Sequence, residues 1–225
     1  MFHAIPRPVT LRMRELEARD ARDRSDGTPR LDRLRQVPPE TGQFLALLAA
    51  SARPGGWIEI GTSAGYSSMW IALACRERDR ILTTFEVLAS KAVMARETIE
   101  SAQIGDVVRL VEGDFLNHVD QLGDVAFCFL DAEKEVYESC YDAIVPRLVP
   151  GGLLVADNAI NHAATLQPLI DRARRTDREG RVGLSQAPER GRFIAAVRNS
   201  MTLRPRRSRK IWLKVDVKTR RRTSC

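Results

Sequence analysis

The chain has 225 residues, the size of one large domain or of one domain with appendages. Its 44% hydrophobic and 29% charged residues are typical of a globular protein and exclude intrinsic disorder of the whole chain. No uncharged apolar run of about 18 residues occurs, so no membrane span is expected. The charged N-terminus is unlike a secretory signal, and we therefore expect a cytoplasmic protein.

The net charge of +7 is unevenly distributed. Residues 201–225 carry ten Lys or Arg and one acidic residue, whereas residues 1–200 have a net charge of −2. The charge distribution thus indicates nucleic-acid binding only through the basic tail, residues 200–225. The alternating stretch at 211–218 is either a strand or an extension with no part in the native fold. The four cysteines lack CxxC or Cys/His spacing, which argues against a zinc site or a disulfide framework.

In chain order, the arginine-rich first 36 residues predict an amphipathic helix, a turn at 26–29 and a second short helix before Pro38. Their apolar side chains (Leu11, Met13, Leu16, Leu31 and Leu34) are too few for a separate core, so this segment should dock on the body or on a second subunit. A buried helix is predicted from Glu40.

Apolar strands and amphipathic helices then alternate, a pattern that predicts an α/β fold with a doubly wound sheet and helices on both faces. Two closing strands after the last helix bring the sheet to about seven strands. The predicted strands cover 57–61, 81–86, 107–111, 125–130, 152–156, 182–185 and 193–197, and the predicted helices cover 66–76, 89–101, 115–121, 136–148 and 163–175.

The loop after the first of these strands reads Glu59-Ile-Gly61-Thr62-Ser63-Ala-Gly65-Tyr-Ser67. Glycines at a strand-to-helix turn let the backbone approach a ligand, and the following helix N-terminus favours an anion. The spacing is neither GxGxxG nor that of a P-loop. A tight turn without a ligand is the alternative.

Two acidic residues indicate which kind of ligand this loop would bind. Glu59 lies inside a strand and needs a partner, which the amino group of a ligand would supply. Glu86 ends the second strand, where a carboxylate can accept bonds from both ribose hydroxyls. Together they indicate a nucleoside ligand with an amine and a carboxylate, a description that S-adenosylmethionine fits.

A second group of polar residues follows the fourth and fifth strands. Asp131 comes after one, and Asp157-Asn158 after the other, so their oxygens should meet at the carboxyl edge of the sheet. Such ligands suit a hard cation such as Mg²⁺, although a lone Asp-Asn pair is commonly a turn or cap. Lys134, one of two lysines in residues 1–200, is a candidate general base; the alternative is a solvated lysine on a first helical turn.

These segments, together with Asp131-x-x-Lys134-x-x-Tyr137, resemble the cation-dependent O-methyltransferases of the catechol and caffeoyl-CoA type over about residues 37–199. The resemblance implies that Asp131, Asp157 and Asn158 chelate Mg²⁺ or another divalent cation, such as Mn²⁺ or Ca²⁺, and that Lys134 deprotonates the acceptor hydroxyl with Asp131 beside it. The S-adenosylmethionine ligands that it implies are Val37, Glu59, Gly61, Thr62, Ser63, Gly65, Ser67, Glu86, Asp114, Phe115, Asp131 and Glu133.

The sequence departs from the family pattern in three places. The caffeoyl-CoA enzymes have an aspartate where this chain has Glu133, so a contact with the cofactor would be longer. The catechol enzymes have aromatic residues between the aspartate and the lysine, where Ala132 and Glu133 stand. Asn161-His162 also lacks a tryptophan often found there. The acceptor pocket therefore cannot be assigned.

We expect a helical lid or dimerisation segment in residues 1–36, a methyltransferase domain in 37–199 and a basic tail in 200–225. The favoured function is methyl transfer to a phenolic hydroxyl of a small molecule by a homodimeric enzyme. An RNA-modifying enzyme, such as a tRNA O-methyltransferase whose tail binds phosphates, is one alternative. A non-catalytic S-adenosylmethionine-binding protein is another, and the complete set Asp131, Lys134, Asp157 and Asn158 argues against it.

Overall fold

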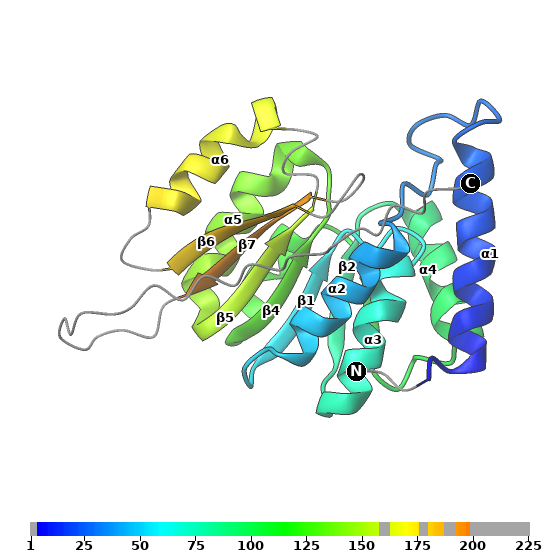
Figure 1. Cartoon of the computed structure of the whole chain (residues 1–225), viewed down its shortest axis with the longest axis horizontal. Helices are drawn as coiled ribbons and strands as arrows, with labels where there is room; N and C mark the ends of the chain where they lie inside the picture. Colours follow the sequence, from blue (N-terminus) through cyan, green and yellow to red (C-terminus); the bar gives the residue numbers. More distant parts are fainter. Residues whose placement is uncertain (1–3, 158–162, 176–179, 187–191, 199–225) are drawn as a thin grey trace, which may run out of the picture.

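The computed structural model describes residues 4–157, 163–175, 180–186 and 192–198 (Figure 1). Its centre is a seven-stranded sheet in the order β3-β2-β1-β4-β5-β7-β6. The first five strands run parallel, and β7 and β6 close the sheet in antiparallel pairing. The predicted doubly wound sheet is thus confirmed. The strands are β1 Gly56–Ile60, β2 Leu82–Glu86, β3 Val108–Glu112, β4 Val125–Leu130, β5 Leu148–Ala156, β6 Gly180–Gln186 and β7 Arg192–Arg198.

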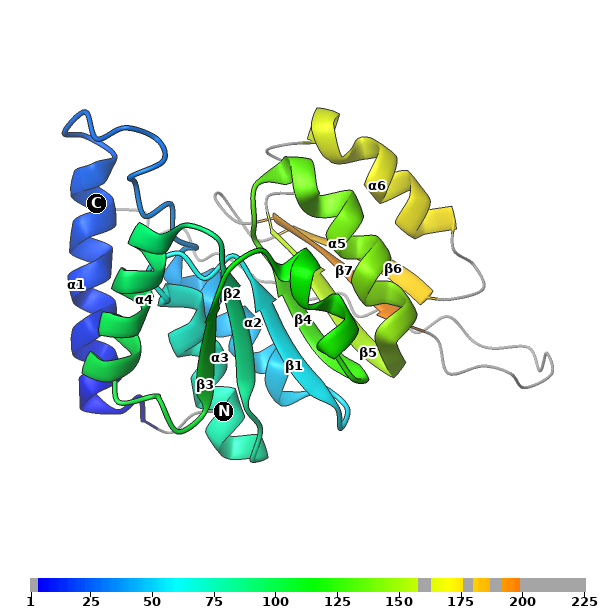
Figure 2. The ribbon, with the colours of Figure 1, turned by 180° about the vertical axis from the view of Figure 1, so that it is seen from behind.

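Helices cover both faces of the sheet, as Figures 1 and 2 show from opposite sides. The helices α1 to α4 lie on one face, and α5 and α6 lie on the other with a 3-10 helix at Phe115–Gln121. Their bounds are α1 Arg7–Asp23, α2 Pro39–Ala50, α3 Tyr66–Arg78, α4 Ala89–Ser101, α5 Tyr137–Ile144 and α6 Ala163–Arg175.

The core has two halves, one on each face, because successive strand residues point to opposite sides of the sheet. In β1, Trp57 packs with α2 and α3, whereas Ile58 packs with α5 and α6. All six residues of β4 are buried, as expected for a central strand covered on both sides, and the edge strand β3 is only partly buried.

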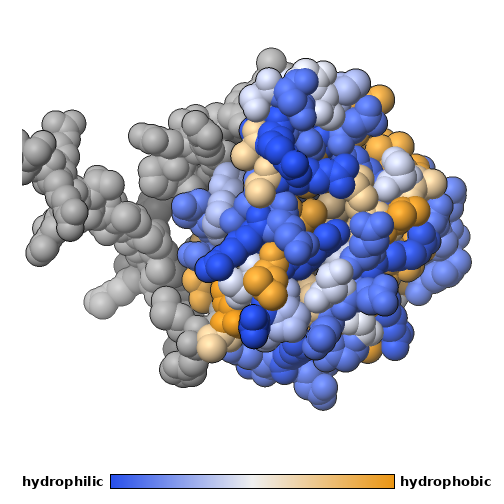
Figure 3. Space-filling model, turned by 90° about the vertical axis from the view of Figure 1, so that its right-hand side faces the viewer, coloured by the Kyte–Doolittle hydropathy of each residue, from blue (hydrophilic) through white to orange (hydrophobic). Residues whose placement is uncertain are grey.

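The N-terminal segment docks on the body of its own chain. Val9, Met13 and Leu16 recur along one face of α1 and are buried against the helices of the first core half. Both ribbon views place α1 beside α4, and Arg12 donates from α1 to Thr98 Oγ1 of α4 at 3.0 Å. The side of the molecule that α1 forms is mostly hydrophilic, with separate apolar spots (Figure 3).

The second short helix predicted before Pro38 is wrong. Residues 24–38 contain turns and extended backbone but no helix, and Leu34 within them is buried. Side chains of other elements bond the backbone here and replace the hydrogen bonds that a helix would make.

Smaller differences concern element ends. The helix predicted at 136–148 ends at Ile144, because Pro146 interrupts it, and β5 begins at Leu148 rather than at Gly152. Within the described ranges, no helix has the length and apolarity needed to cross a membrane. The basic tail predicted at 200–225 lies outside the described residues.

Candidate functional site

The ends of the parallel strands meet at one edge of the sheet. The ladder continues past the strands there, since Asp131 N–H donates to Ile60 O at 2.8 Å and Asp157 N–H donates to Leu130 O at 3.0 Å. β2 lies on one side of β1 and β4 on the other, so the order of the strands along the chain reverses its direction at β1. Doubly wound sheets bind ligands at such a switch point.

Gly61 lies at this switch point with a positive φ of 98°. A Cβ on Gly61 would overlap the carbonyl group of Asp131. The structure gives one reason for glycine at this position, a close approach between two loops of the protein itself, and the predicted approach of the backbone to a ligand stays a prediction. The loop after β1 and the loop after β4 are therefore packed against each other.

Glu86 ties the first loop to the end of β2. Its Oε2 accepts the Ser63 N–H at 2.7 Å, and its Oε1 accepts the Leu88 N–H at 2.9 Å. Ser63 has a positive φ of 48°, and this bond stabilises that conformation. The next residue, Val87, is 65% exposed, so an apolar surface lies beside the carboxylate.

Glu59 is fully buried on the α3 side of β1. Its Oε2 accepts the hydroxyls of Ser68 and of Thr84, the latter at 2.7 Å. Its Oε1 has no hydrogen-bond partner among the described residues. Burial raises the pKa of this carboxyl, and the hydroxyl donors oppose the shift. Thr62 belongs to the same network, because its hydroxyl lies 2.6 Å from that of Thr84.

The remaining residues predicted for the cofactor are less uniformly placed. Gly65 precedes α3 with a positive φ of 85°, and Ser67 is buried in the first turn of that helix. Asp114 is exposed and caps its own 3-10 helix by accepting the Leu116 N–H. Phe115 packs edge to face on Phe85 in one half of the core, and Val37 is buried in the other half.

The ends of β4 and β5 bring two of the predicted metal ligands together. Burial is the largest cause that raises the pKa of the Asp131 carboxyl, and the negative charge of Asp157 is the second largest. Lys134 opposes that shift, with Nζ 3.4 Å from Asp131 Oδ1. Asn158 lies outside the described residues, and within them no three His, Cys, Asp or Glu side chains form a metal cluster.

Lys134 is held by three acceptors. Besides Asp131, its Nζ donates to Ala132 O at 3.0 Å and to the Tyr137 hydroxyl at 2.5 Å. Tyr137 is fully buried and its hydroxyl also contacts the carbonyls of Leu130 at 3.1 Å and Asp157 at 3.3 Å. The sequence pattern contained Tyr137, but its link to both strand ends emerges only from the fold.

Glu133, predicted as a cofactor ligand, pairs with two arginines. Arg30 Nη2 lies 3.0 Å from its Oε2, and Arg35 Nη2 lies 2.5 Å from its Oε1. Both arginines lie in the N-terminal segment, 103 and 98 residues away in the sequence. Its hydrogen bond with Arg35 lowers the pKa of the Glu133 carboxyl.

Curated proteins similar to this chain carry O-methyltransferase names. A catechol O-methyltransferase of Niastella koreensis is 32% identical over 149 residues, which cover 62% of this chain and 67% of that protein. A catechol O-methyltransferase of Mycobacterium tuberculosis is 31% identical over 58% of this chain and 60% of its own length. A putative caffeoyl-CoA O-methyltransferase of Arabidopsis thaliana is 30% identical over 56% and 55%, so the match spans between half and two thirds of these relatives.

Solved structures share the fold at lower identity. A putative O-methyltransferase from Klebsiella pneumoniae has a TM-score of 0.69 at 24% identity, covering 88% of this chain and 93% of that one. The O-methyltransferase from Bacillus cereus, solved in complex with SAH, has a TM-score of 0.66 at 23% identity over 84% and 91%. The model of the O-methyltransferase family matches residues 22–204. Given that match and the arrangement of strands and acids described above, the chain belongs to the O-methyltransferase family.

Proposed function

We propose that this chain transfers the methyl group of S-adenosylmethionine to a hydroxyl of a small catechol-like or other phenolic acceptor, with a divalent cation. The observation that carries the proposal is the division of acids across the switch point. Glu59 and Glu86 lie on the β1–β2 side, and Asp131, Asp157 and Lys134 lie on the β4–β5 side. One half suits a nucleoside cofactor and the other an acceptor.

The cofactor half has groups that fit S-adenosylmethionine. Glu59 Oε1 is a buried acceptor with no partner among the described residues, and an amino group would satisfy it. Each Glu86 oxygen accepts one backbone N–H and retains a lone pair for a ribose hydroxyl. The cofactor supplies an activated methyl group on a sulfonium, and the protein has only to bind and orient it.

The acceptor half fits a divalent cation such as Mg²⁺. A buried carboxylate, Asp157, and a partly buried one, Asp131, repel each other at adjoining strand ends, which is favourable for a cation, and Asn158 would add an amide oxygen. When bound, such an ion would lower the pKa of an acceptor hydroxyl and fix its direction of approach. We assign the metal to Asp131, Asp157 and Asn158.

We assign to Lys134 the removal of the proton from the acceptor hydroxyl. Its Nζ lies beside Asp131, so a hydroxyl bound at the carboxylates would be within reach of the amine. Hydrogen bonds to the Tyr137 hydroxyl and the Ala132 carbonyl further restrict the Nζ position. Its side chain is only 11% exposed, which excludes most competing water.

The test is transfer of a labelled methyl group to a panel of phenols and to bulk tRNA, with and without Mg²⁺. We expect methylation of a phenol that is lost in Asp131→Ala and Asp157→Ala, while binding of S-adenosylhomocysteine changes far less. Asp120→Ala is a matched control, because the Asp120 side chain is fully exposed on the 3-10 helix that precedes β4 in the chain. Undiminished activity in excess chelator would contradict the metal assignment, and methylation of tRNA alone would replace the acceptor class.

A further inference from the structure

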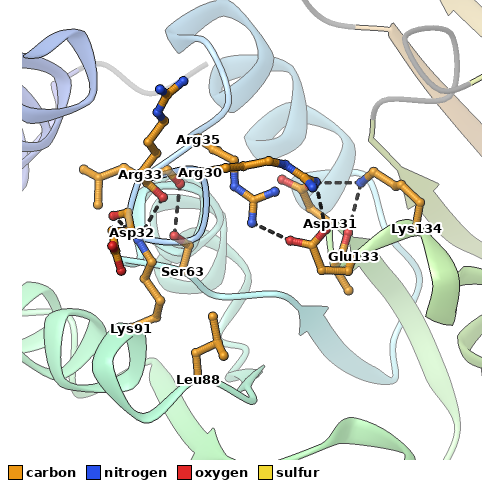
Figure 4. Close-up of polar contacts among 12 residues, drawn as sticks. Arg30, Asp32, Arg33, Arg35, Ser63, Leu88, Lys91, Asp131, Glu133 and Lys134 are labelled. Carbon is orange, nitrogen blue, oxygen red and sulfur yellow. Dashed lines mark hydrogen bonds and ion pairs between the residues drawn. The ribbon is translucent and has the colours of Figure 1, made fainter. Parts of the chain in front are cut away.

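An irregular segment of the N-terminal region, residues 30–36, crosses the carboxyl edge of the sheet, and we call it the strap. Figure 4 shows it lying between Lys91 on one side and Glu133 on the other, above Ser63. The strap has no helix or strand of its own. Buried backbone groups must nevertheless be paired, so other parts of the chain must supply the partners.

Lys91, on the first turn of α4, supplies donors to the strap. Its Nζ donates to the carbonyls of Asp32 and Arg33, both at 2.8 Å. The residue is only 4% exposed, and burying an ammonium group is costly unless it is hydrogen-bonded. Charge-assisted bonds to two successive carbonyls restrict both the position and the orientation of the strap backbone.

Two aspartates of α1 accept hydrogen bonds from the strap backbone. Asp23 Oδ2 accepts the Leu34 N–H at 3.2 Å, and Asp20 Oδ1 accepts the Gln36 N–H at 3.4 Å. Both aspartates are buried. Two N–H groups of the strap thus bond to α1, and two of its carbonyls bond to α4, so both helices hold the segment.

The strap in turn contacts both halves of the site. Ser63 Oγ donates to Leu34 O at 3.1 Å, while Ser63 N–H donates to Glu86 at 2.7 Å. A shift of the strap would thus move the serine that Glu86 holds. At the other end, Arg30 and Arg35 reach Glu133, beside Asp131 and Lys134 (Figure 4).

We propose that Lys91 and Glu133 are positioning residues that act on cofactor binding through the strap. Lys91 fixes the position of two strap carbonyls, and the strap fixes Ser63 through the Leu34 carbonyl. Ser63 in turn holds the Glu86 carboxylate, where the ribose would bind. Glu133 anchors the far end of the strap through the two arginines and is not itself a cofactor ligand. The inference rests on the proposed function, because it concerns the S-adenosylmethionine site.

The first experiment compares Lys91→Met with Arg96→Gln, a control on the same helix whose exposed ion pair is with Glu112 and not with the strap. Calorimetry with S-adenosylhomocysteine measures affinity, and hydrogen exchange measures the amides of the strap. We expect roughly tenfold weaker binding and faster strap exchange in Lys91→Met, because two charge-assisted bonds are lost. Lys91→Arg, which retains two donors, should recover part of both losses.

The second experiment is a double-mutant cycle that does not depend on how well Lys91→Met folds. Glu133→Gln is measured alone, and again in a protein that carries Arg30→Gln and Arg35→Gln. If Glu133 acts through the strap, it weakens binding in the wild-type background and has no further effect once the arginines are gone. An equal loss in both backgrounds would mean direct contact with the cofactor and would overturn the assignment.

The outcomes separate this inference from the proposed function. Binding by the wild type with unchanged affinity in Lys91→Met, despite faster strap exchange, would overturn the role of the strap. Weaker binding without faster strap exchange would mean that Lys91 acts directly. Absence of any binding by the wild type would instead refute the proposed function and, with it, the inference.

Discussion

Replacing Glu86 by glutamine tests the cofactor half of the site most directly. In the protein without ligand, the carboxylate is 6% exposed and accepts backbone N–H groups from Ser63 and Leu88. Glutamine retains one oxygen and turns its –NH₂ group toward the other backbone N–H. One buried N–H thereby loses its acceptor, and a ribose hydroxyl would lose the second oxygen.

The magnitude follows from these contacts. A hydrogen bond to a charged group contributes about 1.5–3 kcal/mol. We therefore expect the free energy of unfolding of Glu86→Gln to fall by about that amount even without ligand. The same energy in the complex corresponds to roughly 10- to 150-fold weaker binding of S-adenosylhomocysteine.

Glu112→Gln is the matched control. Glu112 pairs in register with Glu86 on the neighbouring strand, but its side chain is 39% exposed and bonded to Arg96. Such an exposed pair contributes about 1 kcal/mol or less. Urea unfolding and calorimetry on both variants measure the two effects. Equal losses of stability would refute the argument from burial, and unchanged affinity in Glu86→Gln would refute the ribose assignment.

Three further predictions use other parts of the structure. Burial raises the pKa of the Glu59 carboxyl, so the folded protein binds that proton more tightly than the unfolded chain does. The protein therefore loses stability as pH rises from the pKa of this carboxyl in the unfolded chain to its higher pKa in the folded protein. Glu59→Gln should therefore be more stable than the wild type at neutral and alkaline pH but not at acidic pH, and it should bind the cofactor more weakly. Urea unfolding at several pH values measures the first effect and calorimetry measures the second. A difference in the free energy of unfolding that does not change with pH would contradict the argument. Gly42→Ala should lower the free energy of unfolding by about 1–3 kcal/mol, because its methyl group would overlap the Trp70 ring, and an unchanged urea midpoint would contradict that packing. Deletion of residues 201–225 should leave folding and phenol methylation intact, whereas deletion of 1–36 should impair activity and homodimer assembly; light scattering and a methylation assay on both truncations decide this, and loss of all phenol activity with the tail would favour an RNA substrate.

The alternation of strands and helices was predictable because each element carries its own periodicity. The buried run Val125–Leu130 indicates a central strand without reference to any other part of the chain, and the structure has that strand at the same residues. The strand ends Glu86 and Asp131 could be assigned to one edge of the sheet because parallel strands share a direction. Local patterns thus determine both the fold class and the side of the sheet on which the site lies.

The strap could not be predicted in the same way. Its arginine-rich sequence has helical periodicity, but its backbone is bonded to Asp20 and Asp23 of α1 and to Lys91 of α4, which are separated from it by 11 to 59 residues. Helical propensity is a weak preference that such contacts outweigh.

The residue types thus determined by themselves the sheet, the edge that carries the site and the acids at that edge, because periodicity and strand direction are local properties. Only the tertiary structure decided what each acid touches: that Glu86 holds Ser63, that Glu133 binds two arginines of the strap, and that Tyr137 joins Lys134 to the end of β5. These pairings link segments far apart in the chain. Their partners are selected by the packing of whole helices on the sheet, which no local pattern encodes.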